Sequence, residues 1–137
     1  MTAPPALGTI TPYFTVTDAD ALIAFTVTVF DGEVVKEDRY ADGTVQHARV
    51  RIGDSILMLN QATAAFSANV SQMHLFVETV EGVYTAALRA GAVSVMAPNI
   101  RPHGDLMAGV VDPCGNLWWI AQPRTGEPDR DTPTHAA

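Results

Sequence analysis

Two histidines in strand-like segments are the residues of this sequence best suited to acid–base chemistry. His47 lies in the segment Thr44–Ile52, and His74 lies early in the second half of the chain. An imidazole with a pKa near neutrality can act as a general base, and its nitrogen can bind a divalent metal. No carboxylate accompanies either histidine in its segment, and Arg49 adds a positive charge beside His47. The pattern therefore favours a neutral, hydrogen-bonding role for both histidines over metal binding.

Strand alternation places a mixed set of side chains on one face of the expected sheet, because successive residues of a strand point to opposite faces. His47 and Arg49 share this face, opposite Ala48 and Val50. The residues expected to line a cleft here are Tyr13, His47, Arg49, Met58, Gln72, His74, Phe76, Met107 and Trp119. Aromatic and methionine walls with a few polar groups are typical of a site for a small, partly apolar organic ligand. Arg49 could pair with a carboxylate or phosphate of that ligand.

The same residues also allow an interpretation without a ligand. Met58, Phe76 and Trp119 could fill the space between strands, because small curved sheets often fill their own interior. Arg49 could be a solvated strand residue, which is the common situation of arginine. Cys114 lies in a turn and has no basic neighbour in the sequence to activate its thiol. The sequence contains neither a glycine-rich phosphate loop nor a nucleophile elbow.

The segments that would position these residues begin with a strand, a helix and three more strands. The expected strands are about Thr9–Val16, Glu33–Tyr40, Thr44–Ile52 and Ser55–Asn60. Thr17 and Asp20 form the Thr-x-x-Asp pattern of a helix start, so a helix is expected from Asp18 to about Phe30. The alternating, β-branched segment 25–30 is also compatible with a strand.

The second half of the chain repeats this order at an offset of 61 residues. Without a gap from about Ile10 to Gln122, the offset aligns Val16 with Val77 and Val50 with Val111. The repeat favours the helix in the first half, because its counterpart, Val80–Ala90, is rich in helix-forming residues. The following strands are expected at Ala92–Ala97, Leu106–Val111 and Asn116–Gln122, with a loop over Pro98–Asp105. A duplicated unit is therefore predicted, with repeats over about 9–62 and 71–123.

Composition limits the partners and the location of the protein. The 137 residues are enough for one domain, expected over 9–123, and the Pro-rich, charged segment 124–137 is expected to be disordered. A net charge of −7 with eight Lys and Arg argues against a nucleic-acid surface and against an anionic membrane surface. No apolar run approaches the roughly 20 residues of a membrane helix. The single cysteine and the absence of a visible secretory signal favour the cytoplasm.

Four stretches give the chain a resemblance to the vicinal oxygen chelate superfamily, which includes glyoxalase I, extradiol dioxygenases and bleomycin-resistance proteins. The stretches are Thr11–Asp20, His47–Leu59, Met73–Glu78 and Gly104–Trp118, and they most resemble the PhnB-like branch. The resemblance implies an α+β fold in which two βαβββ modules form a curved mixed sheet with a concave cleft and helices on the convex side. It also implies a homodimer in which a cleft can be built from both chains.

In metal-dependent members of that superfamily, the resemblance implies that each half contributes two ligands, from its first and last strands. The corresponding positions here are Thr11, Met58, Gln72 and Trp119. The family expects His, Gln or Glu there, since divalent metals bind imidazole nitrogen or carboxyl oxygen. Met58 offers a thioether and Trp119 offers no ligand, and Gln72 alone cannot hold a metal. We therefore expect no metal and no other cofactor.

These observations lead to three functional hypotheses. The leading one is a metal-free protein that binds and sequesters a small organic molecule, as bleomycin-resistance proteins do. The alternative is a lyase, isomerase or hydrolase that uses His47 or His74 as a general base, which leaves the catalytic residues open. The third is a metal-dependent glyoxalase-type lyase or dioxygenase, which the residues at the ligand positions disfavour.

Overall fold

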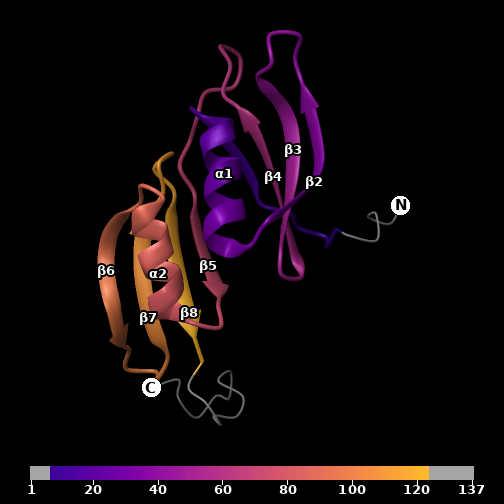
Figure 1. Cartoon of the computed structure of the whole chain (residues 1–137). Coiled ribbons are helices and arrows are strands. Elements are labelled where there is room, and N and C mark those ends of the chain that lie inside the picture. Colours follow the sequence, from indigo (N-terminus) through magenta and orange to yellow (C-terminus); the bar gives the residue numbers. More distant parts are fainter. Residues whose placement is uncertain (1–6, 124–137) are drawn as a thin grey trace.

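The computed structural model describes residues 7–123, and it divides them into two modules with the same order of elements (Figure 1). The first module contains β1 (Tyr13–Val16), α1 (Ala19–Phe30), β2 (Glu33–Arg39), β3 (Val45–Ile52) and β4 (Ser55–Gln61). The second contains β5 (Gln72–Phe76), α2 (Val80–Arg89), β6 (Val93–Ile100), β7 (Leu106–Val111) and β8 (Leu117–Gln122). The predicted α+β fold of two βαβββ units is confirmed. The predicted disordered segment, 124–137, lies outside the described residues.

Each module forms its own four-stranded mixed sheet, with strand orders β1-β4-β3-β2 and β5-β8-β7-β6. The first strand pairs in parallel with the last strand of its module, and the remaining pairs are antiparallel. Within the described chain, β1 and β5 each have one edge without a neighbouring strand, although the carbonyl of Thr15 in β1 accepts a hydrogen bond of 3.1 Å from the backbone N–H of Asn69. The curved sheet expected from the sequence is thus present as two sheets that are not joined within one chain.

The helix α1 forms although its last turns are β-branched. The carboxylate of Asp18 caps the helix by accepting a hydrogen bond of 3.1 Å from the backbone N–H of Ala21, so the cap is Asp18 rather than Thr17. Burial of the apolar side chains in the core outweighs the local strand tendency of residues 25–30. The helix ends at Asp31, which adopts a left-handed φ of 55°. Neither helix of the described chain is long and apolar enough to cross a membrane.

The two modules share one core, in which Trp118 of β8 contacts the first module. The Trp118 side chain is 1% exposed and stacks on Phe14 of β1 with ring centroids 5.7 Å apart. Its ring also lies 4.9 Å from the ring of Phe30 at the end of α1. Each helix covers one face of its own sheet (Figure 1), and these helix-side faces hold the modules together. The opposite face of each sheet is called its open face below.

The strand β6 is longer than the sequence suggested. It continues through Pro98 to Ile100, whereas the expected strand ended at Ala97. Pro98 is tolerated because β6 is an edge strand, where a residue without an N–H need not leave a partner unpaired. The pairing register with β7 also shifts between Met96 and Asn99.

The internal repeat is not a constant offset, because one turn is longer in the second module. Met58 lies opposite Arg49, and its counterpart Trp119 lies opposite Gly109. Met58 and Trp119 are 61 positions apart, but Arg49 and Gly109 are 60 positions apart. The turn between β7 and β8 is therefore one residue longer than the turn between β3 and β4. The gap-free alignment predicted from the sequence is wrong by one residue in β3 and β7.

Candidate functional site

The open face of the first sheet carries Tyr13, His47, Arg49 and Met58. The residues that alternate with them, such as Phe14 and Leu59, are buried in the core. The hydroxyl of Tyr13 lies 3.3 Å from Nδ1 of His47, and the two ring centroids are 5.8 Å apart. Burial lowers the pKa of His47, and the positive charge of Arg49 lowers it further. The neutral imidazole is therefore favoured, and it can accept the hydrogen bond from Tyr13.

Arg49 is a cation without a carboxylate partner among the described residues. Its neighbours on this face do have partners: Arg51 lies 3.6 Å from Glu33, and Lys36 lies 3.4 Å from Asp38. The Nε atom of Arg49 is buried and has no hydrogen-bond partner. Burial of an unpaired donor carries a free-energy cost, so the Arg49 guanidinium would gain from an anionic group placed on this face.

The open face of the second sheet is dominated by Trp119. Its indole ring lies directly over Gly109 of β7, since a Cβ atom added to Gly109 would be 2.6 Å from Cζ3 of the ring. The indole N–H donates a hydrogen bond of 2.6 Å to Oε1 of Gln72 in β5. The ring therefore crosses the sheet between β5 and β7 and is held at both ends, with one side against the backbone.

Two further aromatic residues on β5 extend this surface. His74 lies opposite Trp119, and its ring meets the ring of Phe76 edge to face at a centroid distance of 5.0 Å. The Phe76 side chain is 62% exposed. Met107 of β7 shares a row with Phe76 through Ala121 of β8. The second open face is therefore flat and largely apolar, whereas the first is polar and charged.

Trp118 and Trp119 point to opposite sides of β8. The N–H of Trp118 donates a hydrogen bond of 2.7 Å to the buried carboxylate of Asp112, which also accepts bonds from Asn116. The turn that holds this carboxylate contains Cys114, as expected. Burial raises the pKa of the Cys114 thiol, and its Sγ donates a hydrogen bond of 3.2 Å to the carbonyl of Asp18. The thiol thus has a structural contact between the modules and lacks the activation that a nucleophile needs.

The chain brings the predicted cleft residues together as two sets rather than one. Tyr13, His47, Arg49 and Met58 occupy the first open face, and Gln72, His74, Phe76, Met107 and Trp119 occupy the second. Within the described part of the chain, no hydrogen bond or ring contact joins the two sets. A single chain therefore does not close a cleft around all of these residues.

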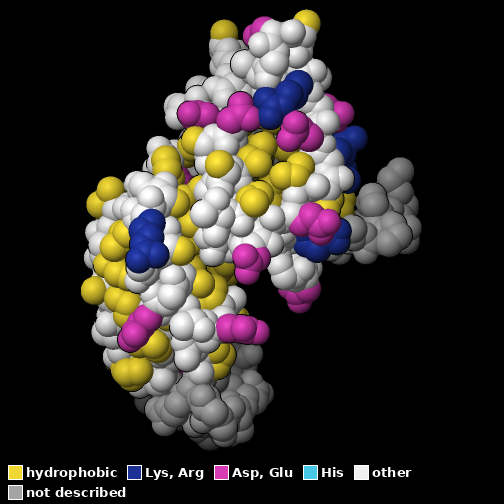
Figure 2. Space-filling model, viewed as in Figure 1, with side chains coloured by type: hydrophobic (Ala, Val, Ile, Leu, Met, Phe, Trp, Pro, Cys, Tyr) yellow, Lys and Arg dark blue, Asp and Glu magenta, His cyan; other side chains and the backbone are white. Residues whose placement is uncertain are grey.

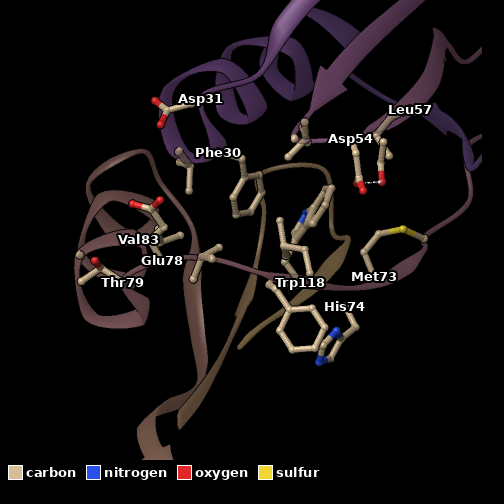
Figure 3. A pocket seen from close by; sticks show the side chains of 18 of the residues that line it. Phe30, Asp31, Asp54, Leu57, Met73, His74, Glu78, Thr79, Val83 and Trp118 are labelled. Atoms are coloured by element: carbon tan, nitrogen blue, oxygen red, sulfur yellow. Dashed lines mark hydrogen bonds between the residues drawn. The ribbon is translucent and has the colours of Figure 1, made fainter. Parts of the chain in front are cut away.

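A groove of about 950 Å³ lies elsewhere, between the two modules along the free edge of β5. The close view shows Trp118, Met73 and Phe30 around it, with the carboxylates of Asp31 and Glu78 on the helix side (Figure 3). The space-filling view shows the hollow between the modules with acidic side chains near it (Figure 2). Of the predicted cleft residues, the groove includes His74 and Phe76. Sequence reasoning missed the groove, and its signal was the edge strand β5, which carries Met73 and Leu75 on one face and the exposed Phe76 on the other.

Comparison with known proteins identifies the family. Residues 7–120 match the model of the Glyoxalase/Bleomycin resistance protein/Dioxygenase superfamily. The chain belongs to this superfamily. It is 32% identical to an uncharacterised protein of Mycobacterium bovis, over 87% of this chain and 84% of that protein.

Solved structures share the fold at lower sequence identity. TioX from Micromonospora sp. ML1 is 23% identical with a TM-score of 0.69, over 88% of this chain and 99% of that chain. A PhnB protein from Bacillus cereus, described as a putative 3-demethylubiquinone-9 3-methyltransferase, is 20% identical with a TM-score of 0.63, over 84% and 99%. These likenesses support the fold described above.

The residues at the superfamily's metal-ligand positions do not fit a divalent metal in this chain. The one suitable donor, Oε1 of Gln72, accepts the N–H of Trp119, and Trp119 itself replaces a ligand. Thr11 and Met58 occupy the other two positions, and a thioether is a poor ligand for hard or borderline cations. Across residues 7–123, no group of three or more His, Cys, Asp or Glu side chains is arranged to hold a metal ion.

Proposed function

We propose that this superfamily member is a metal-free protein that binds a small organic molecule, in a cleft completed by a second copy of the chain. The observation that carries the proposal is the Trp119 indole, which is fixed between Gly109 and Gln72 where a metal-dependent relative would hold its ion. A fixed aromatic wall costs a ligand little reorganisation on binding. Arg49, with no carboxylate partner among the described residues, supplies a directional contact for an anionic group.

The second copy is part of the proposal because each open face is one half of a cleft. In the described chain no strand pairs with the outer edges of β1 and β5, although Asn69 donates one backbone hydrogen bond to Thr15 of β1, and an edge strand is a template for pairing with another chain. Large apolar side chains in these strands or within three residues of them are at least 62% exposed: Ile10, Val70 and Phe76. We place β1 of one copy beside β5 of the other, which would bring Arg49 of one copy and Trp119 of its partner to the same cleft.

Complementation between two variants tests this arrangement. Arg49→Gln and Trp119→Ala each remove one side of the cleft. In a mixed dimer, one cleft would carry both changes and the other would carry neither. Light scattering should give the mass of a dimer at micromolar concentration. A screen of small molecules by thermal shift identifies a ligand for the wild-type protein, and mixing the two variants, after brief denaturation and refolding together, should restore part of its binding.

Two results would contradict the proposal. A clear monomer at micromolar concentration would remove the second copy, and mixed variants that bind no better than either variant alone would place both contacts in one chain. Metal analysis of protein purified without chelator tests the metal-free state. Stoichiometric nickel, zinc, iron or manganese that survives dialysis would overturn it.

An enzyme is the second candidate, and the contact between Tyr13 and His47 favours it. A general base needs an orienting partner, and the Tyr13 hydroxyl lies 3.3 Å from Nδ1 of His47. In the tautomer in which the Nδ1–H donates to the Tyr13 oxygen, Nε2 is unprotonated and can take a proton from a substrate. The lowered pKa of His47 keeps the imidazole neutral near pH 7. A lyase or isomerase of this kind would lose activity as the pH falls through that pKa. The variant His47→Gln should abolish turnover of any substrate found while leaving most of the binding in place.

Two narrower assignments belong to the same proposal. Membership of the PhnB-like branch is supported by the turn segment Asp112–Gly115 followed by Trp118, and by one fold neighbour of that name. A cytoplasmic location is supported by the protonated, half-buried Cys114 thiol, which is the single cysteine of the sequence.

A further inference from the structure

We infer that the ligand is a planar aromatic acid, with its ring stacked on the outward side of Trp119 and its acid group bound by Arg101. This inference rests on the proposed binding function and specifies the ligand class. It is carried by two features of the second sheet, the flat presentation of one indole and a guanidinium at the end of the same face.

The first feature is the way in which the Trp119 ring is held. Three atoms of the ring lie within 3.4 Å of the position that a Cβ on Gly109 would take, so the indole is in contact with the backbone along its benzene ring. The hydrogen bond to Gln72 fixes the pyrrole end of the same ring. One side of the indole is therefore covered, and the other side faces outward in a fixed plane. Such a surface favours a second flat ring, which can stack in an offset arrangement, over a puckered saturated ring.

The second feature is Arg101 at the start of the turn between β6 and β7. Its Nη1 donates a hydrogen bond of 3.0 Å to the neutral side chain of Asn99, and no carboxylate of the described residues lies within salt-bridge distance. The nearby carboxylate of Asp105 lies 3.6 Å from Nδ1 of His103. Arg101 therefore remains available to bind an anion, with Asn99 holding the guanidinium in place.

The two features lie at a spacing that a small molecule can span. Asn99 is opposite Met107, and Met107 is two residues from Gly109 on the same face of β7. Rows on one face of a strand are separated by about 7 Å, which is twice the rise per residue. A fused two-ring acid that stacks on Trp119 can pass over Met107 and bring its carboxylate towards Arg101. The arrangement uses one sheet, so it is present in each chain.

Calorimetric titration with three related probes tests the inference on the full-length protein. The probes are 2-naphthoate, its saturated analogue decahydro-2-naphthoate, and 2-naphthamide, which is flat but uncharged. We expect 2-naphthoate to bind about threefold to tenfold more tightly than the saturated acid, as stacking predicts. We also expect it to bind about tenfold more tightly than the amide, because a charge-assisted hydrogen bond is lost. Equal affinities within either pair would overturn the corresponding half of the inference.

Two matched pairs of variants locate the binding. Gly109→Ala should displace the indole and remove the preference for the flat acid, whereas Gly82→Ala, at a helical position with no neighbour closer than 3.5 Å, should preserve it. Arg101→Gln should remove the preference for the acid over the amide. Arg89→Gln removes the same charge from the exposed end of α2, on the other face of the sheet, and should preserve that preference. Thermal melting of each variant separates lost binding from lost folding.

The outcomes separate this inference from the proposed function. If none of the three probes binds while the thermal-shift screen finds another ligand for the cleft, the aromatic-acid inference is wrong and the binding function stands. If no small molecule binds at all, both are wrong. If the preference for the acid is lost in Arg49→Gln but kept in Arg101→Gln, the anion contact lies on the first sheet and its assignment to Arg101 is wrong.

Discussion

The two open faces use equivalent sheet positions for opposite purposes. In the first module, the row across the sheet is Tyr13, Met58 and Arg49. In the second module, the equivalent row is His74, Trp119 and Gly109. In the first module, the long charged side chain of Arg49 lies opposite the flexible thioether of Met58. At the equivalent positions of the second module, Gly109 lies opposite the indole of Trp119. The two modules therefore differ in the cross-strand pair at the centre of this row, and such pairs are what stabilises neighbouring strands on one face of a sheet.

This difference shows how a duplicated unit can produce a site that neither half contains. The first open face carries charge on Arg49 and directional hydrogen-bonding groups on Arg49, Tyr13 and His47. The second carries a flat apolar surface, because Gly109 has no side chain and the Trp119 indole can pack flat against the sheet there. A small organic ligand needs both kinds of contact, apolar area for affinity and a few polar groups for orientation. In the proposed site, the difference in one cross-strand pair would supply both.

The largest effect expected from testing this comparison concerns the two tryptophans of β8. Trp118→Ala should lower the free energy of unfolding by about 3–5 kcal/mol, because it removes a fully buried ring that stacks on Phe14. Trp119→Ala should cost clearly less, since its outward side is exposed to solvent, and it should weaken ligand binding. Chemical denaturation of both variants measures the difference.

An equal and large loss for both variants would show that Trp119 is part of a packed core. The second open face would then be closed, and the contrast between the two modules would disappear. Trp119→Phe is the matched control, because it keeps a flat ring but lacks the N–H that bonds to Gln72. It should retain more ligand binding than Trp119→Ala.

A smaller effect is expected from the two hydrogen-bond acceptors of these indoles. Asp112→Ala leaves the buried N–H of Trp118 without an acceptor and should cost about 1–3 kcal/mol for each buried donor left unpaired. Gln72→Ala leaves the N–H of Trp119 near solvent and should cost less than 1 kcal/mol, roughly the net value of one exposed hydrogen bond. Urea denaturation of the two variants gives the comparison. A Gln72→Ala loss as large as the Asp112→Ala loss would mean that the second open face is shielded from water.

The fold could be predicted from the sequence because the signals for its helices and strands are local and occur once in each module. The counterpart segment in α2 favours a helix for the ambiguous segment 25–30, and the structure confirms the helix α1. The opposite orientations of Trp118 and Trp119 follow from strand alternation alone. The long strand β6 could not be foreseen, because Pro98 is a break in most strands and is tolerated only at an edge.

The grouping of the site residues could not be predicted, because it depends on how the modules pack. Alternation correctly placed Arg49 and Trp119 on open faces, but it contains no information on whether those faces meet within one chain. The intermodule packing is decided by the stacking of Trp118 on Phe14, a contact between residues more than one hundred positions apart. The extra residue in the turn after β7 likewise hid the correspondence of Arg49 with Gly109.

The smallest effect concerns the pH dependence of the first open face. Because the pKa of His47 is lowered in the folded chain, the folded state binds fewer protons than the unfolded state below the usual histidine pKa of about 6.5. The free energy of unfolding should therefore rise as the pH increases through the folded-state pKa towards 6.5, and this part of the rise should be missing in His47→Gln. Nuclear magnetic resonance titration of the imidazole gives the pKa directly.

Burial is the main cause of the shift and Arg49 the second, so Arg49→Gln should raise the pKa of His47 only part of the way to its usual value. A complete return to that value would make charge rather than burial the dominant cause, and an unchanged pKa would show that Arg49 does not influence His47.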